Sequence, residues 1–189
     1  MRIYVTRHGQ TEWNALGKLQ GRKDIELNEV GREQAAKVRN KLKNEKIDII
    51  ISSTLKRAKE TAKIINKEFN VDIIEDIRLI ERGYGDFEGI TKTELKEMKK
   101  KDSRINEAFN YIKNLSIYNM ETMQDLCKRI YDFLDEITKK YKDKNILLVT
   151  HGSASIPIKC YFMKYPLENL INREKIKGLE NGEVVEFEI

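Results

Sequence analysis

Three short runs of apolar, mostly β-branched residues stand out along the chain, at residues 3–6, 47–51 and 146–150. Within each run the apolar residues follow one another and do not alternate with polar ones, which predicts strands that are buried on both faces. Such strands are typical of a mostly parallel sheet with helices on both sides. Two further strands are predicted at residues 71–77 and 184–189, the last after the turn pair Asn181-Gly182.

Amphipathic helical patterns separate these runs. One covers residues 29–43, after the potential N-cap Asn28, and another follows Ser53. The clearest helix begins after Thr122, which forms a capping-box pattern with Asp125. Strands that alternate with helices predict an α/β fold, a three-layer sandwich with a mostly parallel sheet flanked by helices.

Residues 91–119 interrupt this alternation. A second capping-box pattern, Thr91 with Glu94, begins a helix that is rich in lysine: Lys92, Lys96, Lys99, Lys100 and Lys101. We interpret this segment as a small helical lid inserted into a single domain that spans residues 1–189. Its lysines either contact the part of a substrate beyond the reacting group or form a solvated face.

Length and charge narrow the classes of function. A chain of 189 residues with 40% hydrophobic residues can bury one substantial core. The 36 Lys and Arg residues against 31 Asp and Glu residues leave a net charge of +5, with the two signs interspersed. The aromatic residues are not interleaved with Lys and Arg as in a nucleic-acid stacking platform, so small anionic substrates are favoured over nucleic acid.

The two cysteines, Cys127 and Cys160, lie far apart in the sequence and predict neither a disulfide framework nor a four-ligand zinc site. We therefore expect a reducing, cytoplasmic environment. Neither a signal peptide nor an apolar run of about 18 residues is found, so a membrane partner is not expected. The oligomeric state stays open.

Both histidines of the chain occupy the same kind of position. His8-Gly9 and His151-Gly152 each follow a predicted buried strand. Ligands of open α/β sheets bind at the carboxyl ends of the strands, and a glycine at that point allows a tight turn and close approach. One such histidine would be interpreted as structural, but two in matched positions favour a functional site. A zinc site would need a third clustered ligand, so no metal is expected.

Two arginines are predicted at the same edge of the sheet. Arg7 precedes His8, and Arg57 falls in the first turn of the helix that follows the strand at residues 47–51. Two guanidinium groups, two imidazoles and a helix N-terminus together favour an anion, and phosphate above all. Each arginine alone would be interpreted as a surface ion-pair partner.

Glu81 lies in a glycine-rich loop after a predicted strand. The glycines do not fit Gly-x-Gly-x-x-Gly, and no Gly-Lys-Ser/Thr sequence occurs, so nucleotide binding is not supported. The charge of a nearby phosphate would disfavour the ionised form of this carboxyl group. Glu81 is therefore a candidate general acid.

With these residues, the chain closely resembles the histidine phosphatase superfamily, the phosphoglycerate-mutase-like enzymes. The resemblance extends over nearly the whole chain and rests on Arg7-His8-Gly9 with Asn14, Gln20-Gly21, Asp24, Leu27, Gly31, Ser52-Ser53 with Arg57, the Glu81 loop and Thr150-His151-Gly152. It implies that His8 becomes phosphorylated and that Glu81 protonates the leaving oxygen. It also implies roles for His151 in catalysis, for Arg7, Asn14, Arg57 and Gly152 in phosphate binding, and for Gln20, Gly21, Arg82 and Tyr84 in substrate binding.

The sequence departs from the family pattern at two places. Family members often carry an arginine shortly after the second His-Gly, where this chain has Ser153-Ala154-Ser155. They also often show Gly-Glu-Ser where this chain has Met120-Glu121-Thr122, so Glu121 remains a candidate site residue.

These observations predict a phosphatase that hydrolyses small phosphate monoesters through a phosphohistidine, without a metal or a cofactor. A cofactor-dependent phosphoglycerate mutase is the first alternative, favoured by Glu81-Arg82-x-Tyr84-Gly85 and disfavoured by the chain length. A catalytically idle phospho-ligand binding module is the second, disfavoured because His8 and Glu81 are both retained. The physiological substrate stays open.

Overall fold

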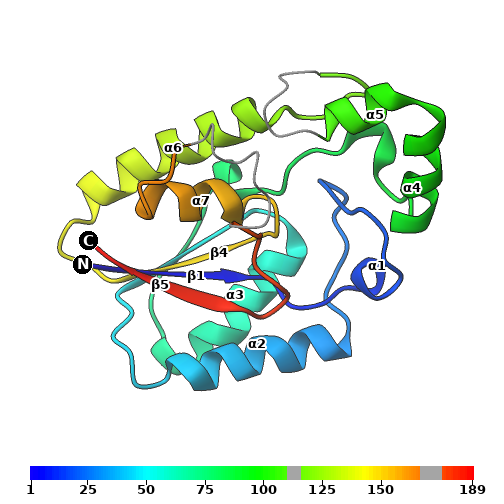
Figure 1. The fold of residues 1–189 in the computed structure, drawn as a ribbon. Coiled ribbons are helices and arrows are strands. Elements are labelled where there is room, and N and C mark those ends of the chain that lie inside the picture. The colour runs from blue at the N-terminus through cyan, green and yellow to red at the C-terminus, as the bar shows by residue number, and fades with distance from the viewer. Residues whose placement is uncertain (110–115, 167–175) are drawn as a thin grey trace.

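The computed structural model describes residues 1–109, 116–166 and 176–189, and in these residues five strands form one sheet in the order β3-β2-β4-β1-β5 (Figure 1). The parallel strands are β1 (Arg2–Arg7), β2 (Ile49–Ser52), β3 (Ile73–Glu75) and β4 (Ile146–Thr150), whereas β5 (Val184–Glu188) pairs antiparallel with β1. The predicted α/β fold with a mostly parallel sheet is confirmed.

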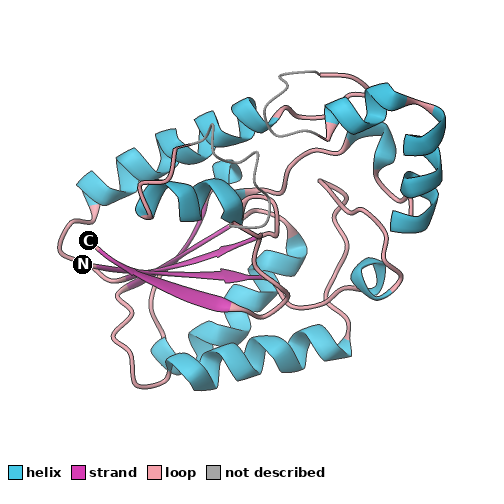
Figure 2. Ribbon diagram, in the orientation of Figure 1, coloured by secondary structure: helices cyan, strands magenta, loops and turns pink. Residues whose placement is uncertain are grey.

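Helices bury both faces of the sheet (Figure 2). On one face α2 (Glu29–Leu42) and α3 (Lys56–Phe69) pack on Leu147 and Val149 of the central strand β4. On the other face α6 (Met123–Lys140) and α7 (Ser155–Phe162) pack on Ile146 and Leu148. Because successive strand residues point to opposite faces, two apolar layers require the continuous apolar runs seen in the sequence.

The strand register brings the predicted site together. Arg7 at the end of β1 is paired with Thr150 at the end of β4, and Ser52 of β2 is paired with Val149. The chain therefore leaves three neighbouring strands at one edge of the sheet. Beyond this edge lie α1 (Glu12–Ala15), α4 (Lys92–Lys101) and α5 (Ser103–Ala108) (Figure 1).

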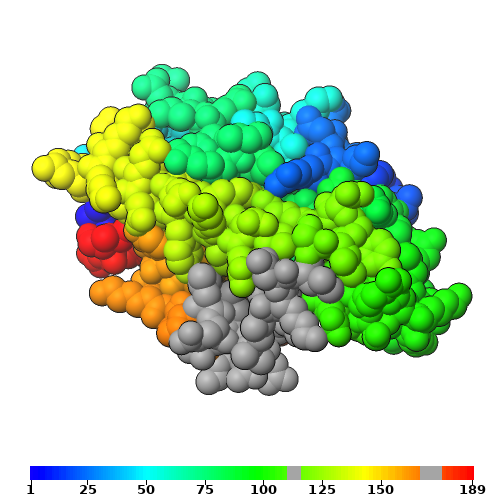
Figure 3. Space-filling model, turned by 90° about the horizontal axis from the view of Figure 1, so that it is seen from above, coloured from blue at the N-terminus to red at the C-terminus, as the bar shows by residue number. Residues whose placement is uncertain are grey.

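Helices α4 and α5 correspond to the predicted lid, of which residues 110–115 lie outside the described residues. The capping box of Thr91 with Glu94 is present at the start of α4. This part has an apolar cluster of its own, formed by Phe87, Leu95, Ile105, Ala108, Phe109 and Met120. Seen from above, α6 runs across the molecule and α4 and α5 lie at one end of it (Figure 3). The lid thus packs as a separate small layer beside the carboxyl edge of the sheet.

Some elements differ from the expectations. β3 has only three residues instead of the predicted seven, and it lies at the edge of the sheet with a largely exposed surface. The helices α1 and α7 were not predicted. In α7 most side chains are buried, so its apolar residues show little helical period. Two short 3-10 helices, η1 (Ile77–Leu79) and η2 (Gly85–Phe87), flank the Glu81 loop.

A close backbone approach joins the loop after β1 to the first turn of α2, and it leads to a stability prediction. A Cβ at Gly31 would stand 2.0 Å from the carbonyl oxygen of Gln10. Alanine normally stabilises a helix relative to glycine by about 1 kcal/mol. Here we expect Gly31→Ala to destabilise the protein by roughly 1–3 kcal/mol, because the backbone must shift. Urea unfolding measures this, with Glu33→Ala on the exposed side of the helix as the control. A gain in stability for Gly31→Ala would contradict it.

Candidate active site

The two histidines lie side by side at the carboxyl edge of the sheet because β1 and β4 are neighbouring strands. Their ring centroids are 5.0 Å apart, and both side chains are buried. The backbone N–H of His8 donates to the carbonyl of Thr150 at 3.0 Å, which continues the strand pairing by one step. The sequence prediction that both imidazoles reach one edge is confirmed by this arrangement.

Hydrogen bonds define the tautomer of each imidazole. His8 Nδ1 lies 2.6 Å from the carbonyl oxygen of Gly9, which can only accept, so Nδ1 carries the proton. Nε2 of His8 is then unprotonated and accepts from Arg57 Nε at 3.2 Å. The same Arg57 N–H lies 3.3 Å from Nδ1 of His151, whose Nε2 donates to Ser53 Oγ at 2.8 Å. His8 therefore presents a lone pair on Nε2, as a nucleophile requires.

Both imidazoles are kept neutral. Burial, followed by the positive charges of Arg57 and Arg7, lowers the pKa of His8 well below its usual 6.5. Burial and the charge of Arg57 lower the pKa of His151 in the same way. Burial lowers the pKa of Arg57 to about 10, so this guanidinium stays charged at neutral pH.

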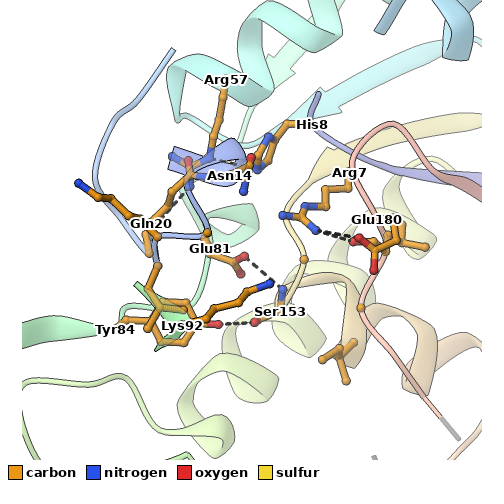
Figure 4. Close-up of a pocket in the computed structure, with 18 residues that line it drawn as sticks. Arg7, His8, Asn14, Gln20, Arg57, Glu81, Tyr84, Lys92, Ser153 and Glu180 are labelled. Atoms are coloured by element: carbon orange, nitrogen blue, oxygen red, sulfur yellow. Dashed lines mark hydrogen bonds and ion pairs between the residues drawn. The ribbon is translucent and has the colours of Figure 1, made fainter. Parts of the chain in front are cut away.

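Arg57 is completely buried at the start of α3 and is held by the backbone of an adjacent loop (Figure 4). Its Nη1 donates to the carbonyl of Lys23 at 2.7 Å and its Nη2 to that of Gly21 at 2.8 Å. One hydrogen of each terminal nitrogen is thus used by the protein, and Nε faces the two imidazoles. The two terminal nitrogens of the guanidinium are turned toward these carbonyls, and Arg57 contributes its charge and its Nε–H to the site.

Arg7 approaches the pocket from the other side. Its Nη1 donates to the carbonyl of Leu179 at 3.0 Å and lies 4.0 Å from a carboxylate oxygen of the exposed Glu180. Its Nε is buried without a hydrogen-bond partner among the described residues. A Cβ at Gly152 would stand 3.4 Å from the Arg7 guanidinium, so the glycine leaves room for this side chain. The Arg7 side chain lines the pocket, so its guanidinium favours an anion there.

Asn14 faces the pocket from α1 with a defined amide orientation. Its Oδ1 accepts hydrogen bonds from the backbone N–H of Thr11 at 3.1 Å, the Thr11 hydroxyl at 3.2 Å and Asn181 Nδ2 at 3.3 Å. The N–H groups of Thr11 and Asn181 can only donate, so the Asn14 atom beside them must be Oδ1. The other atom of the amide, Nδ2, is then left as a donor toward the pocket. Asn181 had been predicted only as part of a turn.

Glu81 lies across the pocket with its carboxylate held by backbone donors (Figure 4). Its Oε1 accepts from the N–H of Arg82 at 2.9 Å and of Ala154 at 3.0 Å, and its Oε2 accepts from the N–H of Ser153 at 3.2 Å. Two of these donors belong to the loop that follows His151. The acid candidate and the second histidine loop are therefore joined directly.

Glu121 does not line the pocket but supports the Glu81 loop from behind. Its carboxylate accepts from Arg129 Nε at 2.8 Å and from the backbone N–H of Gly83 at 3.2 Å. Arg129 Nη2 in turn donates to the carbonyl of Glu81 at 3.1 Å. Sequence reasoning missed Arg129, whose position on α6 resembles that of any half-buried helix residue.

Arg82 is turned away from the pocket, contrary to the expectation that it binds substrate. It is buried, and its Nε and Nη2 donate to the carbonyls of Glu121 at 2.8 Å and Ala108 at 3.1 Å. Its neighbour Glu81 lines the pocket, whereas Arg82 does not. We therefore reassign Arg82 to the support of the loop.

The remaining candidates surround a cavity of about 270 Å³. Gln20, Gly21 and Tyr84 line it, and the Tyr84 hydroxyl lies 2.6 Å from Ser153 Oγ. Of the predicted lid lysines, Lys92 lines the pocket (Figure 4). Lys99 instead lies 4.2 Å from the ring of Phe109. The cavity accommodates a small ligand.

The donors that converge on the cavity are cationic or amide N–H groups, which suit an anion. Within residues 1–109, 116–166 and 176–189, no group of three His, Cys, Asp or Glu side chains is arranged to hold a metal ion. In the same ranges, every helix is too short or too polar to cross a membrane.

Comparison with known proteins assigns the chain to a family. Residues 3–189 match the sequence model of the histidine phosphatase superfamily (branch 1). The chain belongs to this superfamily. The predicted resemblance is thus confirmed over nearly the whole chain.

Relatives within the histidine phosphatase superfamily include several phosphatases. The uncharacterized phosphatase PhoE of Bacillus subtilis is 40% identical over 153 residues, which cover 80% of this chain and 72% of PhoE. A metal-independent phosphoserine phosphatase of Arabidopsis thaliana is 40% identical over 156 residues, 80% of this chain and 64% of that protein. Probable phosphoglycerate mutases of Yersinia pestis are 33% identical over 154 residues, 82% of this chain and 71% of theirs. These relatives support the interpretation as a phosphatase, with the mutases as a lesser possibility.

A solved structure agrees with the histidine phosphatase fold. YhfR of Bacillus stearothermophilus superposes with a TM-score of 0.87 at 28% identity, covering all of this chain and 91% of YhfR. The three-layer arrangement that was predicted from the sequence is therefore that of the superfamily.

The two neutral histidines make stability depend on pH. Their pKa values are lowered in the folded protein, whereas in the unfolded chain they return to about 6.5. As pH falls below 6.5 the unfolded chain takes up protons that the folded protein does not, so stability falls by up to about 1.4 kcal/mol per pH unit for each histidine. We expect His8→Gln to lose less stability between pH 7 and pH 5 than the wild type.

Urea unfolding in phosphate-free buffers at several pH values measures this difference. The carboxylates titrate in both proteins, so their contribution cancels. Parallel stability curves for the two proteins would contradict a neutral His8.

Proposed function

We propose that this chain hydrolyses small phosphate monoesters through a phosphohistidine on His8, without a metal ion. The observation that carries the proposal is the unprotonated His8 Nε2 in a pocket lined by Arg7, Asn14 and Arg57, whose cationic and amide groups suit an anion. Phosphoryl transfer depends mainly on positioning and on stabilisation of the equatorial oxygens. The cationic pocket supplies both.

In the first step the Arg57 Nε–H moves from His8 Nε2 to a phosphoryl oxygen. The freed Nε2 lone pair attacks phosphorus, and the bond from phosphorus to the ester oxygen breaks. Glu81, protonated under the influence of the bound phosphate charge, donates its proton to the leaving oxygen. Arg7 and Asn14 hold the transferring oxygens, and the charge of Arg57 stabilises them. The phosphorylated imidazole gains a positive charge, and its Nδ1–H bond to the Gly9 carbonyl supports that charge.

In the second step a water molecule attacks the phosphorus of the phosphohistidine. Glu81, now a carboxylate, accepts a proton from that water, and the bond between phosphorus and His8 Nε2 breaks. Inorganic phosphate leaves, and the imidazole returns to its neutral form with the proton on Nδ1. The same carboxyl group acts first as acid and then as base.

Phosphoglycerate mutase activity uses the same first step but transfers the phosphoryl group to a second hydroxyl. The loop sequence Glu81-Arg82-x-Tyr84-Gly85 favoured it, yet Arg82 points away from the pocket. An idle binding module is disfavoured by the orientation of Glu81, because a carboxylate aimed at a phosphate weakens simple anion binding.

The setting we propose is a reducing cytoplasm and a single domain over residues 1–189. Cys127 and Cys160 are buried free thiols, and burial raises the pKa of Cys127 to about 12 and that of Cys160 to about 11. Neither is a reactive thiolate.

The apolar clusters on both faces of one shared sheet support a single domain. The small cationic pocket favours a small phosphorylated substrate over nucleic acid.

The phosphohistidine gives the first test of function. We expect brief incubation with ³²P-labelled substrate, in the presence of excess chelator, to leave acid-labile and alkali-stable label on the peptide that contains His8. His8→Ala should abolish both label and turnover while thermal unfolding stays cooperative. Label that survives acid, or label on another peptide, would exclude the mechanism.

The second test separates the acid from the phosphate-binding donors. An alkoxide leaving group needs a proton whereas a nitrophenolate does not, so Glu81→Gln should slow alkyl phosphates by roughly 100-fold and p-nitrophenyl phosphate far less. Arg7→Ala removes a donor to the transferring group and should slow both esters alike, by about 10² to 10³. The kcat values on the two esters give the comparison. Equal losses for Glu81→Gln on both would show that this carboxyl group is not the acid.

A further inference from the structure

Asn181 connects two residues of the candidate site although it does not line the pocket itself. Its Nδ2 donates one hydrogen bond to the carbonyl of His8 at 2.9 Å and a second to Asn14 Oδ1 at 3.3 Å. The two acceptors belong to the proposed nucleophile and to a proposed phosphate donor. Asn181 lies more than 160 residues from both along the chain.

The turn that carries Asn181 is closed without its side chain. The backbone N–H of Glu183 donates to the carbonyl of Glu180 at 3.0 Å, and Gly182 takes the left-handed conformation with φ +71°. Gly182 N–H also donates to the carbonyl of Arg7 at 3.3 Å. The turn and its attachment to β1 are thus made by the backbone, and the Asn181 amide is available for the two site residues.

The amide of Asn14 has two possible orientations, and they differ in what they present to an anion. With Oδ1 turned toward Asn181, Nδ2 donates into the pocket. After a rotation of the amide by 180°, Oδ1 would face the phosphate and repel it. The hydroxyl of Thr11 can serve either orientation because it donates or accepts. The Thr11 N–H and Asn181 Nδ2 can only donate, so they select the orientation that binds phosphate.

We propose that Asn181 is a positioning residue that sets the Asn14 amide for phosphate binding, while its bond to the His8 carbonyl holds the Asn181 amide in place. This inference rests on the proposed function. Asn181 acts through Asn14 and does not line the pocket itself.

Two substitutions of Asn181 test the role: one removes the hydrogen-bond donor, and the other replaces it with an acceptor. Asn181→Ala removes both hydrogen bonds, and we expect it to weaken the binding of inorganic phosphate roughly tenfold. Asn181→Asp keeps the shape but places acceptors against two acceptors, so we expect a loss of about 100-fold. Asn44→Asp, which makes the same change of charge at an exposed position, should bind phosphate like the wild type. Calorimetry gives the Kd, and thermal unfolding monitors the fold.

A double-mutant cycle shows whether Asn181 acts through Asn14. Once Asn14→Ala has removed the amide, adding Asn181→Ala should weaken phosphate binding by no more than about twofold. The side-chain amide signals of Asn14 in a ¹⁵N spectrum should also shift in Asn181→Ala. Fully additive losses of affinity, or unchanged affinity in Asn181→Ala, would overturn the positioning role. These measurements need only the alanine variants, so they decide the question even where Asn181→Asp does not fold.

Phosphate affinity is measured without turnover, which keeps this inference distinguishable from the proposed function. A wild-type protein that binds phosphate but hydrolyses no ester would refute the proposed function. The double-mutant cycle would still test the positioning role of Asn181, because it measures phosphate binding. A wild-type protein that hydrolyses esters while both Asn181 variants keep wild-type kcat and phosphate Kd would refute the positioning role alone. A wild-type protein that does not bind phosphate would overturn both.

Discussion

The site depends on the hydrogen bonds that the buried guanidinium of Arg57 donates to its neighbours. Removing a charge from water is costly, and here two backbone carbonyls and two imidazole nitrogens accept hydrogen bonds from it. One N–H shared between His8 and His151 requires an unprotonated nitrogen on each ring. The same positive charge, together with burial, keeps both rings neutral. The position of this side chain thus determines the tautomers and the protonation of the proposed catalytic pair.

Each half of the site has its own support from a distant part of the chain. Arg7, His8 and Asn14 are held by hydrogen bonds from the segment that precedes β5. Glu81 is held by the loop after β4 and by Arg129 of α6, which is paired with Glu121. A side chain that is held by several independent bonds loses little freedom when a ligand binds, and such preorganisation favours catalysis.

The charges of the pocket lining are mainly positive and therefore suit an anionic ligand. Arg57 stays positive while the histidines stay neutral, and Arg7, Lys18 and Lys92 also line the pocket. A phosphate monoester dianion offers acceptors to the buried donors. Of the described residues, Glu81 and Glu180 contribute carboxylates to the pocket lining, and Glu81 is the one proposed to transfer a proton. In the proposed mechanism, the phosphate-binding groups and the acid Glu81 line the same pocket.

The sequence by itself determined most of the sheet, the helices α2, α3 and α6 that cover it and the arrival of two histidines at one edge. These features depend on local apolar periodicity and on the geometry of parallel strands. Arg57 and Glu81 also followed from their positions in the sequence, whereas Asn14 came from the family motif. Only the tertiary structure decided that Arg82 points away from the pocket, that Arg57 turns its terminal nitrogens to backbone carbonyls, and that Asn181 orients Asn14. These outcomes depend on hydrogen bonds between loops far apart in the sequence, and the partners of a polar side chain in a loop are set by whichever segments the fold brings beside it.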